Sequence, residues 1–319
     1  MKEMRKVAVL VSTYNHERFI EESVRSVVTQ KTDFDYRVII MDDCSTDQTR
    51  KIVVRLRDEF PEKIELILAD KNRNDNSLWR EVIHDTSSPY VAIIDGDDYW
   101  TSSDKLQKQA DYMDAHPEIA IIFHNATTIY EDGSVPAELF NPTDQKLVST
   151  LDDLWKGNFI AGCAPMIRKA AIGYIPEWFI ELKWGDWPLY ILAARHGTIG
   201  YVNDVMGVYR VHRAGLWSGR NETQQIEGVI QFYEAMNRNL EYHYNPAIRA
   251  SVTKCYYRLA VVHERNIDFA RARWCAAKCI ARGAIFDENI PTRHLFRVFL
   301  RSCFPISHSR VSTAGKKMQ

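Results

Sequence analysis

Short apolar runs alternate with amphipathic segments along the first third of the chain. The runs are rich in Val, Ile and Leu and end at polar residues, as do strands that are buried on both faces of a sheet. They lie at 7–11, 37–41, 64–69 and 90–94. Apolar positions recur at helical spacing over 17–30 and over 78–86. A further helix is predicted after Ser45 and Gln48, whose spacing forms a capping-box pattern. This alternation predicts an α/β fold with a mostly parallel sheet covered by helices.

The pattern becomes less regular after this point and changes again near residue 222. We expect a helix ended by Pro117, a long strand, a short helix, a strand-like segment, a helix opened by Trp184-Gly185-Asp186-Trp187, and two strands. These elements are placed in order at 103–116, 119–130, 151–155, 160–167, 184–196, 198–202 and 205–211. Helical spacing alone follows, over 222–243, 247–264, 268–282 and 292–303. The sequence therefore predicts an α/β domain over 1–221 and an all-helical C-terminal region over 222–319.

Composition and charge exclude several classes of protein. The 319 residues include 41 basic and 42 acidic ones, so a net charge of −1 gives no general attraction for nucleic acid. The six cysteines form no C-x-x-C pair, which disfavours a disulfide framework and favours a reducing compartment. The N-terminal apolar run is too short for a secretory signal, and no apolar stretch is long enough to span a membrane. We therefore expect a cytoplasmic protein.

The last segment of the chain, 292–319, is basic. It holds six Lys and Arg residues and no acidic one, with apolar residues interleaved. A basic amphipathic helix of this kind can lie at the inner face of the plasma membrane as a peripheral contact. It can equally dock on an acidic face of the protein itself. Both alternatives stay open at the level of sequence.

Three carboxylates follow the fourth apolar run within four positions, at Asp95, Asp97 and Asp98. Their mutual repulsion requires a compensating cation if they are buried. An oxygen-only set of ligands suits a hard divalent ion, Mn²⁺ or Mg²⁺, which commonly bridges carboxylates to a substrate diphosphate. The alternative is a solvated acidic loop after a strand.

Two other predicted strands end in polar residues that could share a crevice with these carboxylates. One ends at Ser12-Thr13-Tyr14 and the other at Asp42-Asp43. The carboxyl ends of parallel strands face the same way, so these side chains are expected at one edge of the sheet. Neither a G-x-G-x-x-G nor a Walker A sequence is present, so phosphate would be held by a metal and side chains. The expected ligand is a metal-bound nucleotide or nucleotide conjugate.

The order of these motifs resembles that of the family 2 glycosyltransferases, which have the GT-A fold. The resemblance rests on the V-S-T-Y-N sequence ending at Asn15, the D-D-C-S-T-D sequence from Asp42, and the D-G-D-D sequence from Asp95. It covers about residues 6–219, and the helical region lies outside it. It implies an inverting, metal-dependent transferase that uses a nucleoside-diphosphate sugar.

The resemblance also implies roles for individual residues. Tyr14 and Asp43 would hold the nucleotide base, with Ser12 beside them. Asp97 would contact the ribose or diphosphate, Asp98 would bind the metal, and Asp95 would support both. Asp186 would be the general base, although a carboxylate at the start of a helix can also be a helix N-cap.

Other candidates come from the residue types themselves. His212 could complete the metal shell or contact the diphosphate, and Arg210 could neutralise a phosphate. The loop that contains Trp217 could close on the donor. Arg80 could likewise face the diphosphate. Arg80, Arg210 and Trp217 are expected to bind the nucleotide sugar, and His212 is expected to bind the metal together with Asp97 and Asp98.

The reaction expected is transfer from a UDP-sugar to a hydroxyl of a saccharide or lipid-linked saccharide in the synthesis of a surface polysaccharide. Two other functions remain possible from sequence. A nucleotidyltransferase that makes an activated sugar should carry a glycine-rich basic segment near its start, which positions 9–16 lack. A non-catalytic interaction protein would use the helical region as its working surface.

Overall fold

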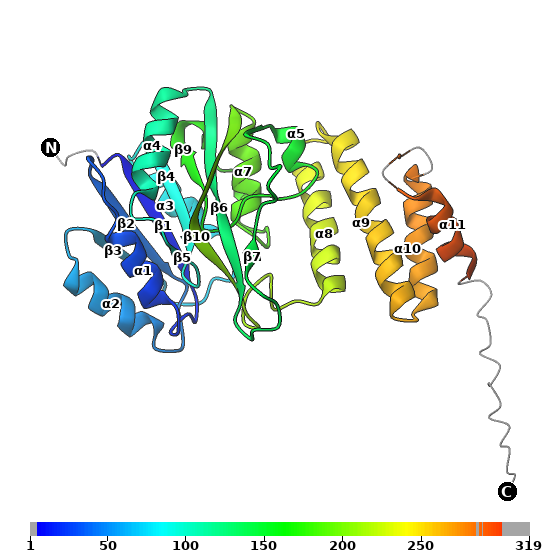
Figure 1. The fold of residues 1–319 in the computed structure, drawn as a ribbon, viewed down its shortest axis with the longest axis horizontal. Coiled ribbons are helices and arrows are strands. Elements are labelled where there is room, and N and C mark those ends of the chain that lie inside the picture. The colour runs from blue at the N-terminus through cyan, green and yellow to red at the C-terminus, as the bar shows by residue number, and fades with distance from the viewer. Residues whose placement is uncertain (1–4, 285–286, 289, 302–319) are drawn as a thin grey trace, which may run out of the picture. The chain divides into compact units, whose positions relative to one another are not determined.

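The computed structural model describes residues 5–284, 287–288 and 290–301. The chain divides into two compact units, Met1–Arg220 and Asn221–Gln319. The first unit holds every strand found in the described residues, and the second consists of helices (Figure 1).

A single ten-stranded sheet forms the centre of the first unit, with the order β3-β2-β1-β4-β9-β6-β10-β5 and with β7 beside β6 and β8 beside β10. The pairs β1–β2, β1–β4, β2–β3 and β6–β10 are parallel, and the remaining pairs are antiparallel. The strands are β1 (Val7–Thr13), β2 (Tyr36–Asp42), β3 (Ile64–Leu68), β4 (Tyr90–Asp95), β5 (Tyr99–Trp100), β6 (Ile119–Tyr130), β7 (Glu138–Leu139), β8 (Val148–Ser149), β9 (Met166–Arg168) and β10 (Thr198–Val211). The predicted α/β fold is confirmed.

The carboxyl ends of β1, β2 and β4 lie side by side. In the strand register Ser12 is opposite Asp95, and Thr13 is opposite Asp42. The apolar run at 7–11 is fully buried, because both faces of these central strands are covered. The expected common edge for the polar strand ends is therefore present.

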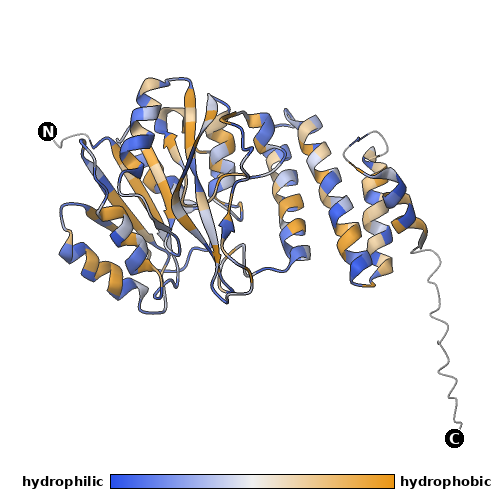
Figure 2. Cartoon of the chain, in the orientation of Figure 1, coloured by the Kyte–Doolittle hydropathy of each residue, from blue (hydrophilic) through white to orange (hydrophobic). Residues whose placement is uncertain are grey.

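Helices with one apolar side cover this sheet, as the two-coloured ribbons in Figure 2 show. Their contacts are α1 with β1 and β5, α2 with β3, α4 with β6 and β9, and α7 with β6. The helices of this unit are α1 (Ile20–Val28), α2 (Thr49–Glu59), α3 (Ser77–Asp85), α4 (Lys105–Ala115), α5 (Leu151–Leu154), α6 (Lys169–Ile172), the 3₁₀ helix η1 (Glu177–Phe179) and α7 (Asp186–Ala194).

Three predicted details of the first unit are wrong. The predicted capping box does not form, since α2 begins only at Thr49 and the Ser45 hydroxyl instead accepts a hydrogen bond from the Asn15 N–H (2.9 Å). The strand predicted over 160–167 is limited to β9, because residues 160–165 turn toward the carboxylates. The two strands expected after α7 are one strand, β10, in which the register shifts between Val202 and Val205.

The second unit contains α8 (Glu222–Asn239), α9 (Asn245–Arg265), α10 (Phe269–Ala281) and α11 (Thr292–Arg301), and no strand occurs in its described residues. The basic helix α11 packs on α9 and α10 and buries Leu295 and Val298. No helix in the described residues has the length and apolar character needed to cross a bilayer. Residues 302–319 of the basic segment lie outside the described residues, and membrane contact stays a prediction.

Candidate active site

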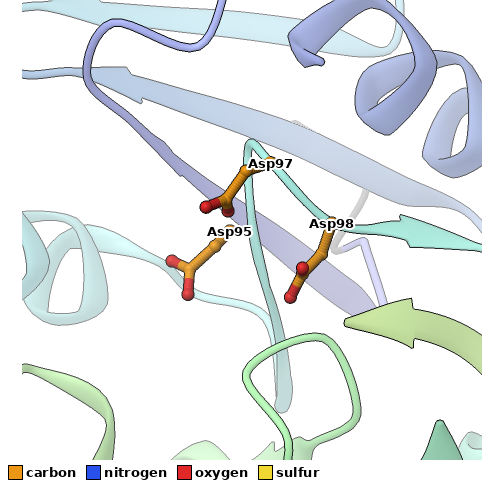
Figure 3. Close-up of side chains that lie close together, drawn as sticks. All are labelled: Asp95, Asp97 and Asp98. Atoms are coloured by element: carbon orange, nitrogen blue, oxygen red, sulfur yellow. The ribbon is translucent and has the colours of Figure 1, made fainter. Parts of the chain in front are cut away.

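The centre of the site is the turn that joins β4 to β5 and carries Asp95, Asp97 and Asp98. One oxygen from each carboxylate lies within 4.8 Å of the others, and the three side chains gather around the turn (Figure 3). Gly96 allows a close approach here, because a Cβ at that position would lie 2.9 Å from both the Ile20 Cδ1 and the Thr13 Oγ1 atoms. The tight turn thus places three acids around one small volume.

Asp98 has the most informative surroundings of the three. Its side chain is 1% exposed, and its Oδ1 atom accepts a hydrogen bond from the Arg210 N–H (2.8 Å). Its Oδ2 atom is buried without a hydrogen-bond partner among the described residues. Burial raises the pKa of Asp98 well above its usual value, and the charge of Asp97 adds to the effect. A divalent cation would relieve both the unpaired oxygen and the repulsion, so the residues fit the predicted metal.

Asp97, in the same cluster as Asp98, forms a pair with His212. The His212 Nε2 atom lies 2.9 Å from the Asp97 Oδ2 atom, and the His16 Nε2 atom lies 3.8 Å from the same oxygen. Burial opposes ionisation of Asp97, but the hydrogen bond with His212 and the charge of His16 outweigh it and lower the pKa of Asp97. The structure therefore brings His212 to the acid cluster, as expected, and adds His16, which the sequence reasoning missed.

Asp95 is held by Ser12 across the strand register. The Ser12 hydroxyl donates a hydrogen bond to the Asp95 carboxylate. Burial, followed by the charge of Asp97, raises the pKa of Asp95 to about 7. Gly162 approaches from the 160–165 turn, where a Cβ would lie 2.9 Å from the Asp95 Oδ2 atom. Ser12 and Asp95 therefore line the cluster.

Arg210 lies at the cluster but binds the backbone of the turn. Its Nη1 atom donates to the Asp97 carbonyl (2.7 Å), and its Nη2 atom pairs with Glu22. Its guanidinium also lies over the Tyr99 ring, 4.6 Å from the centroid. These contacts hold the turn that carries the carboxylates. They differ from the phosphate contact expected for Arg210.

The polar ends of β1 and β2 form the second part of the site. Both carboxylate oxygens of Asp43 accept hydrogen bonds from the backbone, from the N–H groups of Arg73 (2.8 Å) and Asn74 (3.1 Å). Tyr14 is 41% exposed. The neighbouring Asp42 is instead buried, 2.9 Å from Arg50. Of the two adjacent aspartates, only Asp43 is therefore partly open to a ligand, and its orientation is set by the segment after β3.

Asp186 is the first residue of α7, and Gly185 occupies the N-cap position. The alternative of an N-cap role for Asp186 is therefore wrong. The Asn158 amide approaches the Asp186 Oδ2 atom at 3.4 Å, and burial raises the pKa of Asp186. Trp184 packs edge-on against Trp217 with ring centroids 5.3 Å apart, so the Trp217 loop reaches the segment that carries Asp186.

Asn76 holds the segment before Asp186 in place. Its Nδ2 atom lies within hydrogen-bond distance of the carbonyls of Leu182 (2.6 Å) and Trp184 (3.2 Å). A Cβ at Gly185 would lie 3.0 Å from the Asn76 Oδ1 atom. Asn76 is thus a positioning residue that the sequence did not reveal, because nothing local marks a side chain that binds a segment about a hundred residues away.

Arg80 is directed elsewhere in this structure. Its Nε atom donates to the Ile175 carbonyl (2.9 Å), and its Nη2 atom lies 3.2 Å from the Tyr174 hydroxyl. Its guanidinium also lies over the Tyr174 ring. The guanidinium of Arg80 therefore contacts the 174–175 segment and not the acid cluster.

A buried lysine lies behind the turn, at the start of α4. Lys105 is fully buried, and its Nζ atom has no hydrogen-bond partner among the residues described but lies 3.9 Å from the Trp100 ring centroid. Burial lowers the pKa of Lys105 to about 7. A cation–π contact offsets only part of the cost of burying this charge.

Lys105→Met is expected to stabilise the protein more near pH 7 than near pH 9. Between the folded pKa of about 7 and the unfolded value of 10.5 the unfolded chain binds more protons, so wild-type stability rises with pH. Methionine has no proton to bind, so its advantage should shrink by about 2 kcal/mol over this pH interval. Urea unfolding of both proteins at the two pH values measures it. An advantage that does not change with pH would contradict the buried-amine account.

Comparison with known proteins supplies the family. A family model described as "Glycosyl transferase family 2" matches residues 8–174. An uncharacterized protein of Mycobacterium tuberculosis is 34% identical over 212 residues, which cover 66% of this chain and 60% of that protein. This chain therefore spans less than two thirds of that relative.

Two solved structures share the fold. One is Staphylococcus aureus TarS, a poly(ribitol-phosphate) β-N-acetylglucosaminyltransferase, whose residues 1–349 were solved in complex with UDP-GlcNAc. It has a TM-score of 0.61 and 18% identity over 93% of this chain and 88% of the other. The other is the mannosyltransferase PcManGT of Pyrobaculum calidifontis with GDP-Man and Mn²⁺, which has a TM-score of 0.55 and 17% identity over 95% of this chain and 88% of the other.

Proposed function

This chain belongs to glycosyl transferase family 2, and we propose that it moves a sugar from a UDP-sugar to a saccharide or lipid-linked saccharide hydroxyl, with inversion at the anomeric carbon. That it is a glycosyltransferase using a nucleotide sugar follows from the family. The finer claims concern the metal, the base, the nucleotide and the acceptor. Membership of the family favours sugar transfer over nucleotidyl transfer and over a purely non-catalytic role.

One observation carries the assignment of the donor site, namely the buried and unpartnered Oδ2 atom of Asp98 beside Asp95 and Asp97. We infer that Asp98, Asp97 and His212 hold Mn²⁺ or Mg²⁺ there. The bound metal would offset the charge that develops on the departing nucleoside diphosphate. The relative PcManGT was solved with Mn²⁺ and GDP-Man, which supports a metal-dependent donor site.

We assign Asp186 as the general base that takes the proton of the acceptor hydroxyl. Its raised pKa brings the carboxylate closer to the range in which a base both ionises and accepts a proton efficiently. Asn158 orients the carboxylate through the Oδ2 atom. Attack by the activated hydroxyl on the face opposite the leaving diphosphate inverts the anomeric configuration.

The nucleotide base is assigned to Tyr14 and Asp43. The exposed Tyr14 ring can stack on a base. The Asp43 carboxylate, held by two backbone N–H groups, keeps lone pairs that can accept from the N–H of a uracil ring. The TarS structure in complex with UDP-GlcNAc supports the choice of UDP, and the poly(ribitol-phosphate) in the name of TarS supports a polymer as acceptor.

Asp43→Asn is expected to weaken UDP binding by about tenfold or more, because a hydrogen bond to a charged acceptor is lost. The amide would also point its own N–H group at the Arg73 or Asn74 N–H. Calorimetric titration with UDP and Mn²⁺ measures the loss, and inorganic pyrophosphate should bind as before. Asp70→Asn, on the exposed loop after β3, is the matched control. Equal losses for UDP and pyrophosphate would contradict a role limited to the base.

Release of UDP from a panel of UDP-sugars tests the function directly. The panel is compared with GDP-mannose, with Mn²⁺ and with EDTA, and the anomeric configuration of the product is read by NMR. We expect metal-dependent release of UDP and an inverted product. Cleavage of GDP-mannose alone would overturn the choice of UDP, and a retained anomeric configuration would overturn the assigned chemistry.

A further inference from the structure

The second unit contains a pocket of about 400 Å³ that lies far along the chain from the acid cluster. It is formed by the last turns of α8, the turn that follows, the first turns of α9, and Arg282 after α10. We call it the arginine pocket, after Arg238, Arg249 and Arg282. Nothing in the proposed sugar transfer uses these residues.

The charges in the arginine pocket are not balanced. Its lining holds three arginines and one acidic residue, Glu234. The Arg282 Nη2 atom lies 3.5 Å from the Glu234 Oε1 atom, a long contact. Arg249 donates from its Nε atom to the Arg282 carbonyl (3.1 Å), which leaves the outer edge of its guanidinium available. The Arg238 carbonyl accepts a hydrogen bond from the Glu241 N–H (3.0 Å), but its guanidinium makes no ion pair or hydrogen bond within the described residues. The pocket therefore favours an anion.

The type of anion follows from the geometry of the side chains. Guanidinium groups bind phosphate oxygens through two parallel N–H groups, and Arg is preferred over Lys where such a planar match is needed. Helix α9 also begins at the pocket, at Asn245, and the positive end of its dipole adds attraction for a negative group. A phosphate group fits both features.

An aromatic side chain borders the arginine pocket and indicates what carries the phosphate. Tyr242 is 59% exposed. The backbone has positive φ angles at Glu241 (51°) and Tyr242 (60°), which residues other than glycine rarely adopt. The Tyr242 N–H donates to the Asn237 carbonyl (2.8 Å), which holds this turn. This left-handed turn ends α8 and leaves the Tyr242 ring exposed at the pocket, where such a ring can stack on a sugar.

We propose that the arginine pocket binds a phosphate group of a saccharide–phosphate chain, with Arg238 and Arg249 on the phosphate and Tyr242 against the adjoining sugar or alditol. That this saccharide–phosphate polymer is also the acceptor of the transfer reaction rests on the proposed function. The phosphate binding itself does not.

The test is equilibrium binding to the full chain of a short synthetic glycerol-phosphate oligomer. Inorganic phosphate, a neutral maltooligosaccharide, and vesicles of phosphatidylglycerol or phosphatidylcholine are titrated alongside. The variants are Arg238→Gln and Arg249→Gln, alone and together. Arg258→Gln is the matched control, because Arg258 is an exposed arginine on the same helix as Arg249 and outside the pocket.

We expect the oligomer to bind the wild type and the control equally, and each pocket variant to bind it about tenfold more weakly, as befits loss of a charge-assisted hydrogen bond. Binding should also weaken as salt is added. Oligomer binding that the double variant retains, equal binding of the neutral saccharide, or binding of phosphatidylglycerol vesicles without binding of the oligomer would each overturn the proposal.

The same variants separate this proposal from the proposed function. Binding of UDP in the presence of Mn²⁺ should be unchanged in the double variant, because the donor residues lie in the other unit. Failure of UDP to bind the wild type would count against the donor site and leave the oligomer result to be judged alone.

Discussion

Asp186→Asn is expected to lower kcat by about 10²- to 10⁴-fold while the affinity for the UDP-sugar stays close to that of the wild type. The amide keeps the shape of the carboxylate and can still accept a hydrogen bond from Asn158. It cannot take a proton from the acceptor hydroxyl. Initial rates at saturating donor, together with calorimetric titration of UDP, separate the two effects.

The acidic side of the pH–rate profile adds an independent test of Asp186. The base must be ionised to act, and burial raises its pKa, so the wild-type rate should fall as the pH drops toward that raised value. The residual rate of Asp186→Asn should lack this decline. Asp152→Asn, an exposed carboxylate on α5, serves as the control. A variant with full activity, or one that loses donor binding as strongly as rate, would show that Asp186 is not the base.

Asp98→Asn is expected to lower kcat/KM by about 10³-fold, because a metal that stabilises the leaving diphosphate contributes several kcal/mol. The Arg210 N–H can still donate to the amide oxygen, so the turn should keep its hydrogen bond. The charge that pairs with the metal is lost. Rates measured over a series of Mn²⁺ concentrations should show no saturation in the range where the wild type saturates.

Thermal unfolding distinguishes this loss from misfolding. Without metal, Asp98→Asn should be at least as stable as the wild type, because it removes a buried carboxyl group. Burial and the charge of Asp97 both oppose the ionisation of that group. Mn²⁺ should raise the unfolding temperature of the wild type and not that of the variant. Equal activation of both proteins by Mn²⁺ would contradict the role given to Asp98.

The sheet and its acid cluster could be predicted from sequence because their signals are local. Apolar runs such as 7–11 and 90–94 are continuous along the chain, and the three carboxylates follow directly after one of them. Parallel pairing then brings the polar strand ends to one edge of the sheet, and the structure places Ser12 opposite Asp95 there. The amphipathic helices follow from spacing in the same way, and their observed ends differ from the expected ones by only a few residues.

The contacts that orient the site could not be predicted, since they join distant segments. The N–H groups of Arg73 and Asn74 that hold Asp43 leave no trace in residue type, because any residue except proline has an N–H group. Arg80 and Arg210 show the converse case. Each was expected at a phosphate because arginines bind phosphates. The observed partners are instead a carbonyl oxygen and the Tyr174 hydroxyl for Arg80, and a carbonyl oxygen and Glu22 for Arg210.

The capping box failed for a related reason. Ser45 and Gln48 have the required spacing, but the loop after β2 is tied to the loop after β1 through the Asn15 N–H and the Ser45 hydroxyl. The Asn15 Oδ1 atom also accepts from the Thr46 N–H (2.8 Å). Tertiary contacts at the site thus displaced a local helix signal by several residues, and the helix begins at Thr49.

Calorimetric titration of the wild type with UDP, in Mn²⁺ and in EDTA, tests the central claim most directly. The account predicts that UDP binds in Mn²⁺ and much more weakly in EDTA, that GDP binds more weakly than UDP, and that Asp98→Asn abolishes the difference made by the metal. UDP binding of equal strength with and without metal, or none under either condition, would contradict the assignment of the acid cluster as a metal-dependent donor site.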